Sequence, residues 1–193
     1  MTRIRPPLWG NFVDHADWDL LSFCWLYQGG LLLPGLYHAT QAVEKYLKAL
    51  TLSILDPDGE TETALNNRWL RTHDLVLLAE RCVVRFPFYG NSEILTQFRR
   101  FSEFDLATRY PWVKQKHGNG LTSAEIPLLC DLMRQLRTDL PIKVDDYILG
   151  MLVRGHHHGR PEAGTNNYLL AGLAGSLAAL QRTFPEVDRI VRW

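Results

Sequence analysis

GLYHATQAVEKYLKALTLSIL, residues 35–55, is the stretch that decides the fold. Its apolar residues recur at steps of three and four, which places them on one stripe of an α-helix: Leu36, Ala39, Val43, Leu47, Leu50 and Ile54. Polar residues gather on the opposite side, which we interpret as a solvated face: Tyr37, Gln41, Glu44, Lys45 and Lys48. Pro34 suits the start of a helix, and the turn residues 56–59 suit its end.

Four other segments show the same helical rhythm. We expect helices over residues 11–28, about 72–86, from 91 or 92 to about 109, and from 122 or 123 to about 140. Their expected core residues are Val13, Ala16, Leu20, Cys24 and Tyr27; Leu75, Leu78, Cys82 and Phe86; Ile94, Phe98, Phe101 and Phe104; Ile126, Leu129, Met133, Leu136 and Leu140. The first of these helices carries a second apolar stripe, Trp18, Leu21 and Trp25, so we expect two neighbours around it.

These segments predict an all-α fold, an antiparallel bundle of about five helices over residues 11–140. Residues 1–10 are expected to form an N-terminal arm, and residues 141–193 a helical C-terminal extension. Within the extension, small residues over 165–182 would allow a helix to lie flat against the bundle or against a second copy of the chain.

Composition limits the classes of function. Formal net charge is +0, so any site for a polyanion must be a local patch rather than an overall basic field. Three cysteines, Cys24, Cys82 and Cys130, without CxxC spacing argue against a disulfide framework and against a zinc site, and they favour the cytoplasm. The apolar run Tyr168–Leu180 has 13 residues, whereas a membrane-spanning helix needs about 20. We therefore expect a cytoplasmic protein without a membrane span.

Three segments resemble a known family. The run 37–50, YHATQAVEKYLKAL, is similar to the second helix of HEPN domains (higher eukaryotes and prokaryotes nucleotide-binding). Residues 71–75, RTHDL, resemble the family's entry to its next helix, and residues 107–111, ATRYP, resemble the close of the helix after that. The resemblance covers roughly residues 12–140 and implies a HEPN-like helical bundle.

The resemblance implies two functions: binding of nucleotide or RNA, and metal-independent RNA cleavage in members of toxin or defence type. Cleaving members carry an Arg and a His with four to six residues between them, which can activate a ribose 2′-hydroxyl and stabilise the attacked phosphate. Arg68 and His73 have four intervening residues, but Trp69 stands where the family has a polar residue. Arg109 and His117 have seven. Neither pair fits fully, so both stay candidates and the chain's status as an enzyme stays open.

Each of these candidates also has a structural interpretation. His73 follows Thr72, the expected helix cap, and can fix the loop by bonding to the backbone. Arg109 can pair with Asp105 one helical turn earlier, or cap carbonyls at the end of its helix.

A basic and aromatic segment follows the fourth expected helix. Cations suited to phosphate and rings suited to base stacking occur together there: Arg109, Tyr110, Trp112, Lys114, Lys116 and His117. The alternative is a solvated loop. Lys45 and Lys48 are further candidates for phosphate binding, although Glu44 and Lys48 also have the spacing of an ordinary helix-face ion pair. Residues 156–158, three adjacent histidines, lack other ligands at suitable spacing, so we predict no metal and no cofactor.

Three hypotheses follow. The first is a HEPN-like protein that binds nucleotide or RNA, acting as a homodimer. The second is a metal-independent endoribonuclease, which in this family can be paired with a minimal nucleotidyltransferase partner. The third is a helical interaction module without enzymatic activity. None of the three requires a membrane.

Overall fold

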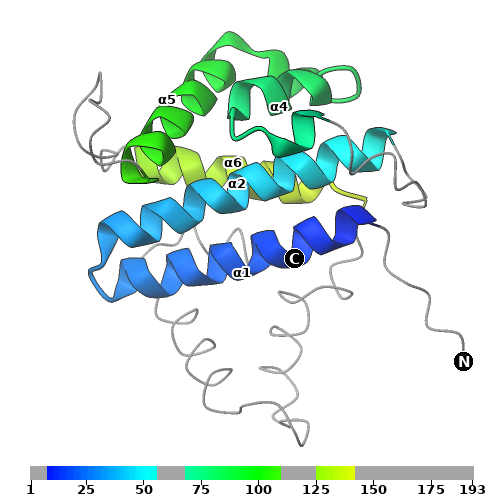
Figure 1. The fold of residues 1–193 in the computed structure, drawn as a ribbon. Helices are drawn as coiled ribbons and strands as arrows, with labels where there is room; N and C mark the ends of the chain where they lie inside the picture. Colours follow the sequence, from blue (N-terminus) through cyan, green and yellow to red (C-terminus); the bar gives the residue numbers. More distant parts are fainter. Residues whose placement is uncertain (1–7, 56–67, 110–124, 142–193) are drawn as a thin grey trace, which may run out of the picture.

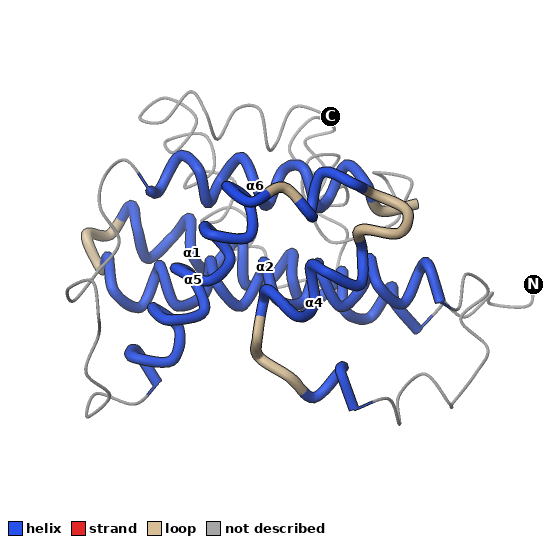
Figure 2. The backbone as a smooth tube through the Cα atoms, turned by 90° about the horizontal axis from the view of Figure 1, so that it is seen from above, coloured by secondary structure: helices blue, strands red, loops and turns tan. Residues whose placement is uncertain are grey.

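Helix α2 (Leu32–Leu55) is the central element of the structure (Figure 1). It packs against α1 (Leu8–Gln28), α4 (Leu75–Cys82), α5 (Ser92–Arg109) and α6 (Glu125–Asp139). The computed structural model describes residues 8–55, 68–109 and 125–141, and all regular structure within these ranges is helical (Figure 2). Two 3-10 turns complete it, η1 (Arg68–Arg71) and η2 (Pro87–Gly90). The expectation of an all-α chain is therefore confirmed for the described part.

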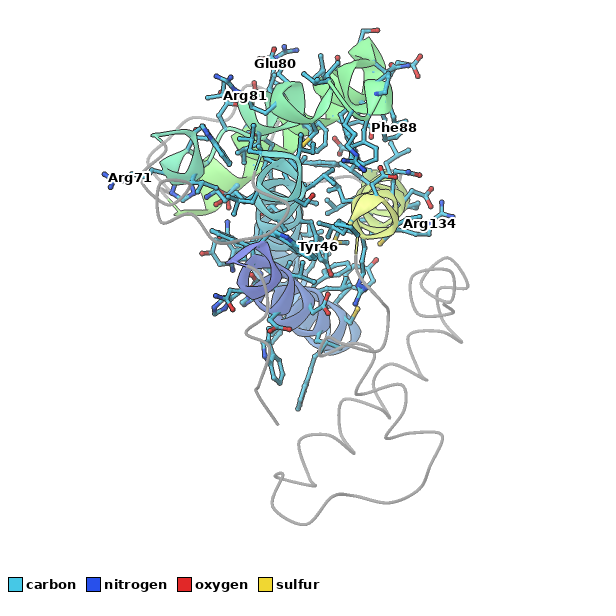
Figure 3. The ribbon with its side chains drawn as sticks, turned by 90° about the vertical axis from the view of Figure 1, so that its right-hand side faces the viewer. Tyr46, Arg71, Glu80, Arg81, Phe88 and Arg134 are labelled. Carbon is cyan, nitrogen blue, oxygen red and sulfur yellow. The ribbon has the colours of Figure 1, made fainter. Side chains whose placement is uncertain are left out.

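The helices surround α2 on several sides. Helix α1 lies antiparallel along one side of α2, and α4 and α5 cover the opposite side, while α6 runs along a third (Figures 1 and 3). Because α2 has a neighbour on nearly every side, its residues from Gly35 to Ser53 are buried with three exceptions, Tyr37, His38 and Lys45.

This arrangement corrects our interpretation of α2 as a helix with one solvated face. Its apolar stripe is buried as expected, with only Ile54 half-buried. The polar side is buried too, since Gln41, Glu44 and Lys48 are only 8%, 4% and 6% exposed. Burial of a charged side chain is costly unless it is paired, so these residues must have partners within the bundle.

The turn between α1 and α2 is built on Gly30. Its backbone has φ +76°, a left-handed conformation that glycine adopts without steric cost. The amides of Gly30 and Leu31 donate to the carbonyls of Tyr27 and Leu26, at 3.1 and 2.8 Å, which is the Schellman pattern that ends a helix. The chain then reverses and α2 begins at Leu32, three residues earlier than predicted, because Pro34 fits within the first turn of a helix.

Helix α1 differs from the prediction in two respects. It begins at Leu8 rather than Asn11, and Trp9 is buried in the core. Of the second apolar stripe, Leu21 is buried, whereas Trp18 and Trp25 are 42% and 46% exposed. The expected second neighbour of α1 thus covers only part of that stripe.

The remaining helices follow the predicted pattern with shifted ends. Helix α4 is capped by Asp74, not by Thr72: the Asp74 carboxylate accepts hydrogen bonds from the amides of Val76 and Leu77. It ends at Cys82, four residues before the expected end at about Phe86, and residues 83–85 form a turn before η2. All but three of the predicted core residues of the four helices are buried; Tyr27, Phe86 and Ile94 are half-buried instead. Cys24, Cys82 and Cys130 are buried free thiols.

No helix within the described ranges is long and apolar enough to cross a lipid bilayer. Two predicted features, the basic and aromatic residues 110–117 and the C-terminal extension 142–193, lie outside those ranges.

Candidate functional site

Polar side chains meet where α2 contacts α5 and the entry to α4. We call this group the polar junction; its members are Thr40, Gln41, Glu44, Lys48, His73 and Asp105. Three elements that are distant in sequence contribute to it, and four of its hydrogen bonds cross between them.

The first half is a carboxylate shared by two cationic groups. Glu44 is buried in α2, and the Lys48 ammonium, one helical turn later, donates to its Oε1 at 2.6 Å. His73 Nδ1 lies 2.9 Å from Oε2 of the same carboxylate and 3.1 Å from Oε1. The predicted pairing of Glu44 with Lys48 is confirmed, but the pair is buried rather than solvated. Lys48 therefore presents little of its charge to solvent.

The contact with Glu44 defines the chemistry of His73. An ionised carboxylate only accepts hydrogen bonds, so Nδ1 of His73 is the protonated nitrogen. In the neutral ring Nε2 is then the basic nitrogen, and the His73 side chain is 58% exposed. His73 lies in the extended link between η1 and α4, which explains why it is accessible. A buried carboxylate thus holds an exposed imidazole in one tautomer, an arrangement typical of a general base and its orienting group.

The second half attaches α5 to both of its neighbours. Asp105 is buried and accepts hydrogen bonds from Gln41 Nε2 at 2.9 Å and from Thr40 Oγ1 at 3.3 Å. One turn earlier on α5, the Ser102 hydroxyl accepts from the amide of Leu75, the first residue of α4, at 3.0 Å. The C-terminal part of α5 is thereby fixed against the middle of α2 and the start of α4.

A separate cluster lies between α1 and α2. Asp19 pairs with Lys45 and with His38, whose Nδ1 is 2.8 Å from the Asp19 carboxylate. Lys45 and His38 are 28% and 32% exposed, so both retain some access to solvent. Lys45 is thus the accessible one of the two lysines that we predicted on α2.

A third group is entirely internal. Arg137 of α6 donates through Nε and Nη2 to the two carboxylate oxygens of Asp17, at 3.2 and 3.0 Å. The Tyr46 hydroxyl of α2 donates to the same carboxylate at 2.6 Å, and Figure 3 shows Tyr46 between α1, α2 and α6. Burial, together with the Asp17 charge, raises the pKa of Tyr46 well above its ordinary value. All three side chains are inaccessible, so their role is to join three helices.

The structure places the predicted site residues as follows. Arg68 is the first residue of η1 and His73 follows that turn by two residues, so both lie on the approach to α4. Arg109 is the last residue of α5, one turn beyond Asp105 of the polar junction. The remaining predicted residues lie outside the described ranges: Tyr110, Trp112, Lys114, Lys116 and His117.

Sequence reasoning missed the partner of His73. Glu44 precedes it by 29 positions on another helix, and no spacing rule connects them. The available signal was the position of Glu44 and Lys48 in the middle of a largely apolar helix. Charged side chains are rarely buried in such a place unless they have further partners. Within residues 8–55, 68–109 and 125–141, no three His, Cys, Asp or Glu side chains are grouped as metal ligands.

Comparison of the chain with models of protein families, with curated proteins and with solved structures gave no match.

Proposed function

We propose that the chain is a HEPN-like protein that binds nucleotide or RNA phosphate beside the polar junction. One observation carries the proposal: the three segments that resemble the family meet in space. Gln41 of the first segment bonds to Asp105, two residues before the start of the third, and Glu44 of the first bonds to His73 of the second. Segments that form one site in a family are expected to be neighbours in space. These contacts therefore support treating the three segments as parts of one site.

The position of Arg109 supports phosphate binding at this place. It ends α5 one turn after Asp105, which bonds to Gln41, so the end of α5 lies close to α2. Arg109, Lys114, Lys116 and His117 supply cations, and Tyr110 and Trp112 supply rings for stacking. Arginine binds phosphate through two parallel N–H groups, which makes Arg109 the first residue to test.

Binding is tested by fluorescence anisotropy with a labelled single-stranded RNA and with nucleotides. Arg109→Ala should weaken binding by about 1–3 kcal/mol, the loss expected for a charge-assisted hydrogen bond. Lys114→Ala with Lys116→Ala should reduce the dependence of affinity on salt. Arg134→Ala is the matched control, since Arg134 is an exposed arginine that points outward from α6 (Figure 3). An absence of affinity for RNA and for every nucleotide at low salt would refute the proposal.

The geometry of His73 favours a second candidate, metal-independent RNA cleavage. Its ring is exposed and is oriented by a buried carboxylate, so Nε2 is available to accept a proton from a ribose 2′-hydroxyl. Arg68, close before it in the chain, would stabilise the phosphate. The wild-type protein should then cut RNA in the presence of EDTA, and His73→Ala should abolish cleavage while leaving binding nearly intact. Equal cleavage by His73→Ala and wild type would exclude this role.

The proposal also includes the assembly of the chain. The chain acts as a homodimer in the cytoplasm, and as a ribonuclease of toxin or defence type it would be paired with a minimal nucleotidyltransferase. Light scattering that gives a stable monomer of about 22 kDa at micromolar concentration would contradict the dimer. A protein that neither binds nor cuts RNA would favour the third hypothesis, an interaction module.

A further inference from the structure

The largest group of exposed apolar side chains lies on α1 and the turn that follows it. Trp18 and Trp25 are 42% and 46% exposed, and they are seven residues apart, so they share one face of α1 about 10 Å apart. The turn adds Leu31, Leu32 and Leu33, which are 55%, 40% and 52% exposed. We call these five residues the tryptophan face. Exposed aromatic and aliphatic side chains in one region usually mark a surface that another segment covers.

The last turn of α6 lies beside α1. Arg137, in the last turn of α6, bonds to Asp17, the immediate neighbour of Trp18 on α1. The described residues end at Pro141, four residues after Arg137. The 52 residues that follow, 142–193, include the apolar run Tyr168–Leu180.

We propose that residues 165–182 of the same chain dock on the tryptophan face. The reach is sufficient, because the 23 residues 142–164 can extend to roughly 80 Å, whereas α1 is only about 30 Å long. The chemistry also fits. The run carries small side chains at helical spacing, Ala171, Gly175, Ala178 and Ala179, and a surface of small residues allows bulky indole rings to pack closely against a backbone. Attachment to α6 supplies a high effective concentration, which favours this intramolecular partner over a separate molecule.

The net charge of the docking segment is low, which suits an apolar contact. Residues 165–182 contain a single charged side chain, Arg182, and the tryptophan face contains none. Burial of the two surfaces against each other therefore removes apolar area from water without the cost of removing charge from water.

Hydrogen exchange measured by mass spectrometry on the full chain tests the proposal. Amides of residues 165–182 should be protected in the wild type, independently of protein concentration. In Trp18→Gln with Trp25→Gln they should exchange at least about tenfold faster, while amides of α2 keep their rates. The matched control is Leu77→Gln with Phe88→Gln, which replaces side chains of similar exposure, 37% and 44%, on the opposite side of α2. That control should leave the rates of residues 165–182 unchanged.

Three results would overturn the proposal. The first is fast exchange of residues 165–182 in the wild type. The second is protection that survives the tryptophan substitutions, or that the control substitutions remove equally. The third is protection that disappears on dilution together with a fall in mass from dimer to monomer, which would assign the tryptophan face to a second copy of the chain. None of these measurements depends on RNA binding, so the outcome is independent of the proposed function.

Discussion

At the scale of single residues, the buried carboxylates Asp17 and Glu44 determine what the core tolerates. Each lies inside the bundle and each has a cationic partner, Arg137 for Asp17 and Lys48 for Glu44. A buried pair contributes little net stability compared with apolar residues, but loss of one partner leaves a charge without compensation. Substitutions of the two cations are therefore informative.

Arg137→Met should lower the free energy of unfolding by about 3–5 kcal/mol, because the buried Asp17 carboxylate would lose its cationic partner, although the Tyr46 hydroxyl would still donate to it. Adding Asp17→Asn removes the charge and keeps an oxygen for the Tyr46 hydroxyl, so the double variant should recover much of the loss. Urea unfolding measures both. A double variant no more stable than Arg137→Met would mean that the loss comes from packing rather than from the charge.

Lys48→Ala should be more damaging than Lys45→Ala. Lys48 is buried and bonds to a buried carboxylate, so its loss should cost about 3 kcal/mol or more. Lys45 is partly exposed, and its pair with Asp19 should be worth only about 1 kcal/mol or less. Thermal or urea unfolding of the two variants gives the comparison, and equal losses would show that Glu44 is solvated when Lys48 is absent.

The Cys82 thiol makes stability depend on pH. Burial raises its pKa from 9.0 to about 11, although the hydrogen bond with Thr51 opposes this shift. Because the pKa of Cys82 is higher in the folded state, the contribution of the protonated thiol to stability is complete below pH 9. That contribution is lost as the pH rises toward 11. Cys82→Ala should flatten this part of the curve of unfolding free energy against pH. An unchanged slope would assign the pH dependence to other groups.

At the scale of elements, α4 depends on its cap. It has eight residues, a length at which a helix has little intrinsic stability. Asp74→Ala should cost about 1 kcal/mol, because two amides at the helix start lose their acceptor. Thr72→Ala should cost less, since the Thr72 hydroxyl accepts from only one amide, that of Asp74, at 3.1 Å. Urea unfolding measures the loss of stability in each variant. A larger loss for Thr72→Ala than for Asp74→Ala would show that Thr72 is the main cap.

The elements were the most predictable level of the fold. Periodicity located all five helices within the described ranges, because apolar spacing reflects which side of a helix is buried. It failed at the ends of helices: Pro34 lies within the first turn of α2 rather than before it, and Asp74 caps α4 in place of the predicted Thr72. It also failed on the polar side of α2, because periodicity cannot reveal that a charged residue has a buried partner on another helix.

The candidate site was less predictable for the same reason. Spacing within a motif identified His73 and Arg109 as residues of interest, but their neighbours Glu44 and Asp105 depend on how α2, α4 and α5 pack. Contacts between residues 29 or 64 positions apart follow from tertiary structure, and a single sequence carries no direct record of them.

At the scale of the whole molecule, α2 makes the described helices one cooperative unit, because every other described α-helix packs on it. Leu50→Ala should lower stability by about 2–5 kcal/mol, the range for a buried leucine. Circular dichroism and tryptophan fluorescence should report the same shifted midpoint in urea. Separate midpoints for the two signals would show that part of the bundle unfolds independently of α2.

The bond between Asp17 and Arg137 also has a consequence for synthesis on the ribosome. The two residues are 120 positions apart, so Asp17 is made long before its partner. At a synthesis rate of roughly 5–20 residues per second, this interval lasts on the order of 6–24 seconds, whereas helical hairpins form in far less than a second. During this interval, a nascent hairpin of α1 and α2 would carry the Asp17 carboxylate without Arg137 on the surface that α6 later covers. We expect α6 to pair that carboxylate with Arg137 and to cover the hairpin only after residues 125–139 have been translated.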